Sequence, residues 1–254
     1  MDAPQTRAER LSIFINRRWM LMVSLFLGVL TGLPFLAPVF MYIGWSGPAK
    51  VIYFIYSWLC HQLPERSYFL FGPKIMYSLP KVQSAWKNTN EVWILRQFIG
   101  NPAMGWKVAW SDRMVSMYAS LWLVGLVWWP LRKRVKPLPF WGLVFLLLPM
   151  ALDGGTHAIS DFTSGIGLGF RDSNTWLAVL TQHVFPTSFY AGDAWGSFNS
   201  IMRIATGVLF GLGVVWFAYP YLDEAFSQQI TFTAPRTFQV SADTTILSNS
   251  KDIH

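Results

Sequence analysis

Long runs of apolar residues, separated by short polar segments, dominate the chain as far as residue 221. Residues 20–45 and 114–131 carry no charged side chain, and residues 201–221 carry only Arg203. About 20 helical residues cross the roughly 30 Å hydrocarbon core of a bilayer. The pattern therefore predicts three transmembrane helices, and residues 140–152 predict a shorter crossing between the second and the third.

Residues 51–71 follow a different pattern, because the polar segment 60–67 interrupts an apolar stretch. A break in a helix at membrane depth is tolerated only where the backbone is buried in protein or lines a wet cavity. We predict that this segment enters and leaves the membrane on the same face. The alternative is a crossing that pairs with a second one near Val92.

Glycines and turn residues refine this outline. Gly28 with Gly32, and Gly207 with Gly211, place small residues one turn apart and predict close approach of neighbouring helices. The two adjacent glycines at residues 154–155 argue against an unbroken helix beyond residue 152. Short helices are predicted at residues 92–99 and 176–182.

The predicted fold is an all-α membrane protein, a bundle of about four transmembrane helices plus a re-entrant or interfacial helical hairpin. Residues 1–222 form one membrane domain, and residues 223–254 form a polar tail that lacks a helical stripe and is expected to be disordered or extended. The composition agrees, because 53% of the residues are hydrophobic and 13% are charged, whereas soluble domains carry about 25% charged residues.

The net charge of +7 is concentrated in part beside the apolar runs, at Arg17, Arg18 and residues 132–136. We attribute these basic clusters to anionic lipid headgroups and to topology, and not to nucleic acid. The positive-inside rule places both clusters, and with them both termini, in the cytoplasm. The chain is thus expected to be a multi-pass protein of the cell membrane.

With this topology, the polar segments between the spans meet at the extracytoplasmic face. They define a candidate polar site, for which the sequence identifies no reaction, cofactor or metal. Its members are His61, Arg66, Asp112, Arg113, Asp153, His157 and Arg203.

Glu65 and Arg66 are adjacent charges, which a membrane domain buries only in pairs. We expect Glu65 to pair with Arg113, and Arg66 with Asp112; contact with a substrate is the alternative.

Cys60 and His61 precede a proline and are expected to hydrogen-bond the broken backbone near Pro64. A bent re-entrant tip could instead bring both side chains to one ligand. Since Cys60 is the single cysteine, an intrachain disulfide is excluded.

Asp153, His157 and Asp161 follow an i, i+4, i+8 spacing that aligns them on one helical face. Such a row could hold a divalent cation or position a general base. Helix capping and pairing within a polar network are the structural alternatives.

Guanidinium groups bind phosphate and carboxylate in a bidentate manner, so a cluster of arginines predicts an anion pocket. For Arg203 the alternative is a simple anchor at the headgroups. The four candidates are Arg66, Arg113, Arg171 and Arg203.

Residues 60–67 read Cys-His-x-x-Pro-x-Arg-Ser, a distinctive element. Together with the later motifs it resembles the small prokaryotic membrane proteins grouped as domain of unknown function twenty eighty-five. The resemblance covers about two thirds of the chain and implies an architecture and candidate positions but no reaction. The later motifs are Asp112-Arg113, Tyr118, Pro149, Asp153-Gly154, Thr156, Arg203, Thr206-Gly207 and Gly211.

The chain departs from that family in one respect. Many members carry further cysteines near the position of Arg113, whereas residues 108–113 contain none here. A thiolate zinc site, which the family pattern would suggest, is therefore not expected in this protein.

Three classes of function remain open. The first is an accessory or structural subunit of a membrane complex, favoured by the close-packing glycines and the lack of a complete catalytic motif. The second is a membrane enzyme or binding protein with an extracytoplasmic site for a metal ion or an anionic, lipid-like substrate. The third is a transporter, although no paired broken helices are visible. The expected partners are the lipid bilayer and, for the first class, other membrane subunits.

Overall fold

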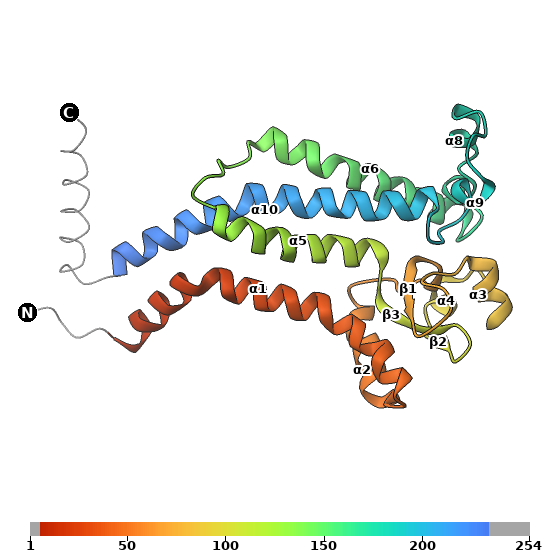
Figure 1. The fold of residues 1–254 in the computed structure, drawn as a ribbon, viewed down its shortest axis with the longest axis horizontal. Helices are drawn as coiled ribbons and strands as arrows, with labels where there is room; N and C mark the ends of the chain where they lie inside the picture. The colour runs from red at the N-terminus through yellow and green to blue at the C-terminus, as the bar shows by residue number, and fades with distance from the viewer. Residues whose placement is uncertain (1–5, 234–254) are drawn as a thin grey trace, which may run out of the picture.

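The computed structural model describes residues 6–233, and side chains as far as Gln229. Four long helices run side by side (Figure 1), and each is long and apolar enough to cross a membrane. The predicted all-α membrane fold is thus confirmed. These helices are α1 (Arg7–Tyr42), α5 (Asp112–Leu131), α6 (Phe140–Ser164) and α10 (Phe198–Thr233).

Helix α10 is the centre of the bundle and packs against α1, α5 and α6. Its contact with α5 depends on two glycines, since a Cβ atom would lie 2.1 Å from Ser116 Oγ at Gly207 and 2.0 Å from Ser120 Oγ at Gly211. Both hydroxyls donate hydrogen bonds to carbonyl oxygens of α10, at 3.2 and 3.1 Å. The predicted close approach at this pair is confirmed.

The other predicted pair behaves differently. Gly28 faces the ring of Trp122, 3.2 Å from where a Cβ atom would lie, but nothing lies within 4 Å of that position at Gly32. Only one of these two glycines therefore lies at a tight helix contact.

Two helices extend further than the sequence predicted. Helix α6 continues without interruption through residues 154–155 to Ser164, because two glycines cost a helix only about 1 kcal/mol each relative to alanine. Helix α10 passes Asp223 and reaches Thr233, so the expectation of a non-helical tail is wrong for residues 223–233. The rest of the predicted tail lies outside the described residues.

One end of the bundle is covered by a cap of short elements (Figure 1). A three-stranded antiparallel sheet, in the order β1-β3-β2, lies within it. Strand β3 runs into α5 without a linker. The strands are β1 (Ser67–Leu70), β2 (Gly100–Asn101) and β3 (Gly105–Ser111), and the short helices are α2 (Ser46–Ser57), η1 (Pro64–Arg66), α3 (Leu79–Ala85), α4 (Val92–Leu95), α7 (Phe170–Ser173), α8 (Thr175–Leu180) and α9 (Thr187–Tyr190).

The sequence did not predict this sheet. Residues 51–71 contain the end of α2 and then, in place of a second helical arm, the strand β1. The physical reason is long-range pairing, because Ser67 lies opposite Ser111 and Leu70 opposite Trp106. Helix α4 is shorter than predicted, whereas α8 falls close to its predicted place.

Candidate functional site

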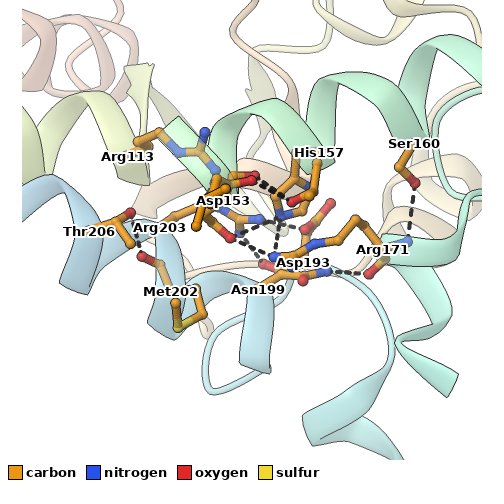
Figure 2. Close-up of polar contacts among 12 residues, drawn as sticks. Arg113, Asp153, His157, Ser160, Arg171, Asp193, Asn199, Met202, Arg203 and Thr206 are labelled. Carbon is orange, nitrogen blue, oxygen red and sulfur yellow. Dashed lines mark hydrogen bonds and ion pairs between the residues drawn. The ribbon is translucent and has the colours of Figure 1, made fainter. Parts of the chain in front are cut away.

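Four arginines and four aspartates meet where the bundle joins the cap, and Figure 2 shows Arg113, Asp153, Arg171, Asp193 and Arg203 among them. They come from the starts of α5 and α10, from the second half of α6, and from three separate cap segments. The predicted convergence of the polar segments is therefore correct. The eight residues are Arg66, Arg113, Arg171, Arg203, Asp112, Asp153, Asp161 and Asp193.

The first part of this cluster is a chain of five residues that we call the Asp193 group. Arg66 holds Asp161 through two hydrogen bonds of 2.6 and 2.9 Å, and its Nε donates to Asp193 at 2.8 Å. Arg203 also donates to Asp193, and its Nε lies 2.8 and 2.9 Å from the two oxygens of Asp112. The two guanidinium groups thus share one carboxylate between them.

Asp193 lies in the loop before α10 and is 3% exposed. Burial opposes ionisation of its carboxyl group, but the charges of Arg66 and Arg203 outweigh burial and hold its pKa below the usual range. Asp193 is therefore an anion that ties the cap to α10.

The second part, the Asp153 group, is centred on α6. Arg113 donates to one oxygen of Asp153 at 2.6 Å, and Arg171 donates to the other at 2.5 Å. Arg171 also lies 3.2 Å from Nε2 of His157. Both oxygens of this carboxylate are thus occupied by guanidinium groups from different elements.

The charges of the two groups are unequal. The Asp193 group contains two arginines and three aspartates, which gives a net charge of −1. The Asp153 group contains two arginines and one aspartate, which gives +1 when His157 is neutral. The cluster as a whole is balanced, but one positive charge in excess is located around Asp153.

The contact with Arg171 assigns the histidine tautomer. A guanidinium group has only N–H donors, so Nε2 of His157 must be the acceptor, and the neutral ring carries its proton on Nδ1. Among the described residues, that Nδ1 has no hydrogen-bond partner, and neither have the Nε atoms of Arg113 and Arg171. Three buried donors without acceptors therefore surround the excess positive charge.

Arg171 is held in place by its backbone. Its amide donates to Ser160 Oγ at 3.1 Å, and its carbonyl accepts from the side-chain amides of Asn174 and Asn199, both at 2.7 Å. Figure 2 shows Ser160 and Asn199 on either side of it. This fixed backbone directs the guanidinium group toward Asp153.

A cavity of about 520 Å³ opens beside the Asp153 group. Helices α5 and α6 both pack against α10 but make little contact with each other, and the cavity lies between them. Five of the seven predicted site residues line it, and we call these five its polar wall; Asp112 and Asp153 do not line it but bind Arg203 and Arg113. These five are His61, Arg66, Arg113, His157 and Arg203.

The rest of the lining includes apolar side chains. Leu59, Met114 and Ile166 contribute to it, together with Phe162 of α6, whose side chain is 93% exposed in the isolated chain. An apolar side chain so exposed on a transmembrane helix contacts lipid. The cavity therefore reaches from the charged cluster to an exposed apolar side chain of α6.

The predicted pairs around Glu65 are wrong. Arg66 binds Asp161 and Asp193 rather than Asp112, and Arg113 binds Asp153 rather than Glu65. The prediction paired the segment around Glu65 with the next charged segment, residues 112–113. The loop that contains Asp193 lies much further along the chain and supplies a partner of Arg66 instead.

Glu65 is instead 1% exposed, and its two carboxyl oxygens have no hydrogen-bond partner among the described residues. Burial raises the pKa of this carboxyl group to about 7. Burial also lowers the pKa of Lys107 on β3 to about 7, while its Nζ donates to the carbonyls of Gln62 and Arg96 at 2.7 and 3.0 Å. The sequence did not single out Lys107, because β3 is buried at four consecutive residues, 107–110, and shows no alternation that would place a lysine inside.

Cys60 and His61 lie in different environments. The backbone amide of Gln62 donates to Cys60 Sγ at 3.4 Å, which confirms the predicted contact of this thiol with the broken backbone. His61 is exposed at the wall of the cavity.

The row of Asp153, His157 and Asp161 lies on one face of α6, as predicted, but both carboxylates are bound by arginines. Within residues 6–233, no group of three or more His, Cys, Asp or Glu side chains is arranged to hold a metal ion. The row thus serves ion pairing in this structure.

Fold and site together define a polytopic α-helical membrane protein with a buried charged cluster beside a lateral cavity. Residues 102–217 match the family described as predicted membrane protein (DUF2085), which confirms the resemblance noted from the sequence. Over 166 residues the chain is 28% identical to an uncharacterized protein of Methanocaldococcus jannaschii. This alignment covers 61% of the chain and 79% of the relative. No solved structure matches. The segment matching the family contains the whole Asp153 group.

Proposed function

We propose that this protein binds an amphiphilic membrane molecule in the cavity between α5 and α6. The observation that carries the proposal is the lining of the cavity, which combines arginine and histidine with apolar side chains. Its volume of about 520 Å³ falls within the usual range for small-molecule sites. A headgroup would occupy the polar wall, and the attached chain would leave past Phe162 into the bilayer.

The ion pairs also support a purely structural role, as expected of an accessory subunit. Eight interlocked charges would hold the cap on the bundle whether or not a ligand binds. A structural cluster, however, gains nothing from an adjacent cavity or from buried donors without acceptors, because each such donor costs about 1–3 kcal/mol. Ligand binding explains both features.

We further propose that the cavity faces the extracytoplasmic side and that both termini are cytoplasmic. This orientation is supported by the basic residues near the start of α1 and at residues 132–136, which lie at the end of the bundle away from the cap.

The proposal is tested by filling the cavity. Ala158 lines it, whereas its neighbour Ile159 does not, and both are exposed on α6. Ala158→Trp is expected to abolish retention of co-purifying lipid or added amphiphile, measured by native mass spectrometry in mild detergent. Ile159→Trp places the same side chain outside the cavity and should bind like the unmodified protein.

Equal retention by both variants would contradict the proposal. Specific co-purification of a second membrane protein without a retained amphiphile would favour the subunit role instead.

A further inference from the structure

We infer that the polar wall of the cavity is a site for a single oxyanion, and that the headgroup bound there is a phosphodiester or a carboxylate with one negative charge. This inference rests on the proposed function and specifies its ligand. It is carried by three features of the Asp153 group: its excess charge, its donors without acceptors, and its position beside the cavity.

The first feature limits the charge of the ligand. Asp153 neutralises only one of its two arginines, and both of its oxygens are already occupied. A monoanion would bring this group to neutrality, whereas a dianion would add uncompensated negative charge in a buried site. A neutral headgroup would leave the existing excess in place.

The second feature defines the chemistry. The Arg113 side chain donates to Asp153, and neither its Nε nor the Nδ1–H of His157 has an acceptor among the described residues. Both side chains line the cavity, and their unpaired donor atoms lie just beneath its surface, so a bound anion would reach them after a small shift of the two side chains. Donors without acceptors select a group that presents several oxygen acceptors, and hydrogen bonds to an ionised oxygen are the stronger kind.

The third feature is that no acid competes for these donors. Asp161 is the one acidic residue among the described residues that line the cavity, and both of its oxygens accept from Arg66. Arg66 and Arg203 line the cavity as well, but they are engaged with aspartates. Arg113 and His157 thus remain as the contacts for the anion, and Arg171 contributes charge and fixes the tautomer.

The experiment compares headgroups on the same detergent-solubilised protein. We expect phosphatidylglycerol, a monoanionic phosphodiester, to be retained at least about tenfold more tightly than diacylglycerol, which has the same chains and no phosphate. Phosphatidylcholine tests whether a phosphodiester beside a cationic group is accepted, and inorganic phosphate alone, used as a competitor, tests the free anion.

The outcomes separate this inference from the proposed function. Equal retention of phosphatidylglycerol and diacylglycerol would overturn the oxyanion site and leave amphiphile binding intact. Retention of no amphiphile, together with saturable binding of inorganic phosphate, would overturn amphiphile binding and leave the oxyanion site. Failure of all probes would overturn both.

Two adjacent glycines provide a matched pair of variants. A Cβ atom at Gly154 would lie 2.7 Å from a terminal nitrogen of Arg113, whereas nothing lies within 4 Å of that position at Gly155. Because the obstructed atom is the end of a flexible side chain, Gly154→Ala should fold and displace the guanidinium group. We expect this variant to lose most of the preference for phosphatidylglycerol and Gly155→Ala to keep it; the same preference in both would argue against a role for Arg113.

Discussion

Asp193 is the residue on which the charged cluster most depends, because it joins Arg66 of the cap to Arg203 of α10. Its partners are nearly as buried as it is, with side-chain exposures of 12% and 3%. In so dry an environment, removing one member leaves an uncompensated charge, and this costs more than the pair itself contributes.

We therefore expect Asp193→Asn to lower the free energy of unfolding by about 3–5 kcal/mol, read as a large drop in apparent melting temperature in mild detergent. Asp223 offers the control, since its pair with Arg132 spans 3.7 Å and is about 30% exposed on both sides. Such half-exposed pairs contribute about 0–1 kcal/mol. Equal melting temperatures for Asp193→Asn and Asp223→Asn would refute the central role of Asp193.

Glu65 makes a pH-dependent contribution. Its folded pKa is about 7 against an ordinary value of 4.5; burial raises it, Arg66 and Lys107 lower it, and the charge of Asp193 adds to the rise. Between these values the folded protein keeps the proton that the unfolded chain releases, so raising the pH across this window favours unfolding. By pH 8 the lost stability is on the order of 3 kcal/mol.

Glu65→Gln should remove this loss, so the variant should become more stable than the unmodified protein as the pH rises from 4.5 to 8. Glu91→Gln alters an exposed carboxylate and should leave the pH profile unchanged. A stability difference between the unmodified protein and Glu65→Gln that does not vary with pH would contradict the assignment.

Among the elements, α5 and α10 make the most extensive contact. Gly207 and Gly211 allow serine hydroxyls of α5 to reach the backbone of α10. In a bilayer such packing replaces the hydrophobic effect as the main source of helix association.

Gly211→Ala should separate these helices and destabilise the protein by about 1–3 kcal/mol, since its Cβ atom would also lie 2.7 Å from the backbone nitrogen of Leu121. Gly32→Ala meets nothing within 4 Å and should be neutral or slightly stabilising. Apparent melting temperatures of the two variants test this, and a Gly211→Ala protein as stable as Gly32→Ala would show that the contact is not tight.

The elements also show which features the sequence could predict. The four spans follow from hydropathy, and the meeting of their polar ends follows from the basic clusters beside the spans; both signals are local in the sequence. The sheet could not be predicted, because Ser67 pairs with Ser111 across a long intervening segment. Asp193 was missed for a similar reason, since it lies in a loop without periodicity and acquires its role only through Arg66 and Arg203.

For the whole molecule, both ends of the bundle differ in character. The cap with its charged cluster closes one end, while the start of α1, the loop between α5 and α6 and the end of α10 share the other (Figure 1). A protein built in this way presents the cavity to one side of the membrane only.

Cysteine labelling in intact cells tests the proposed orientation. In a Cys60→Ser background, Asn88→Cys marks the cap and Lys133→Cys marks the opposite loop, both at exposed positions. We expect a membrane-impermeant maleimide to label the first without permeabilisation and the second only after it. The reverse pattern would place the cavity in the cytoplasm.

The balance of four arginines and four aspartates has an electrical consequence. As long as the cluster carries no net charge, the voltage across the membrane does no net work on it. One bound monoanion would change that sum to −1, and an elementary charge that crosses the full potential gains or loses about 2.3 kcal/mol per 100 mV. The binding free energy of the anion would then depend on the membrane voltage. The size of this effect would scale with the fraction of the potential that the anion crosses between the solution and the cavity.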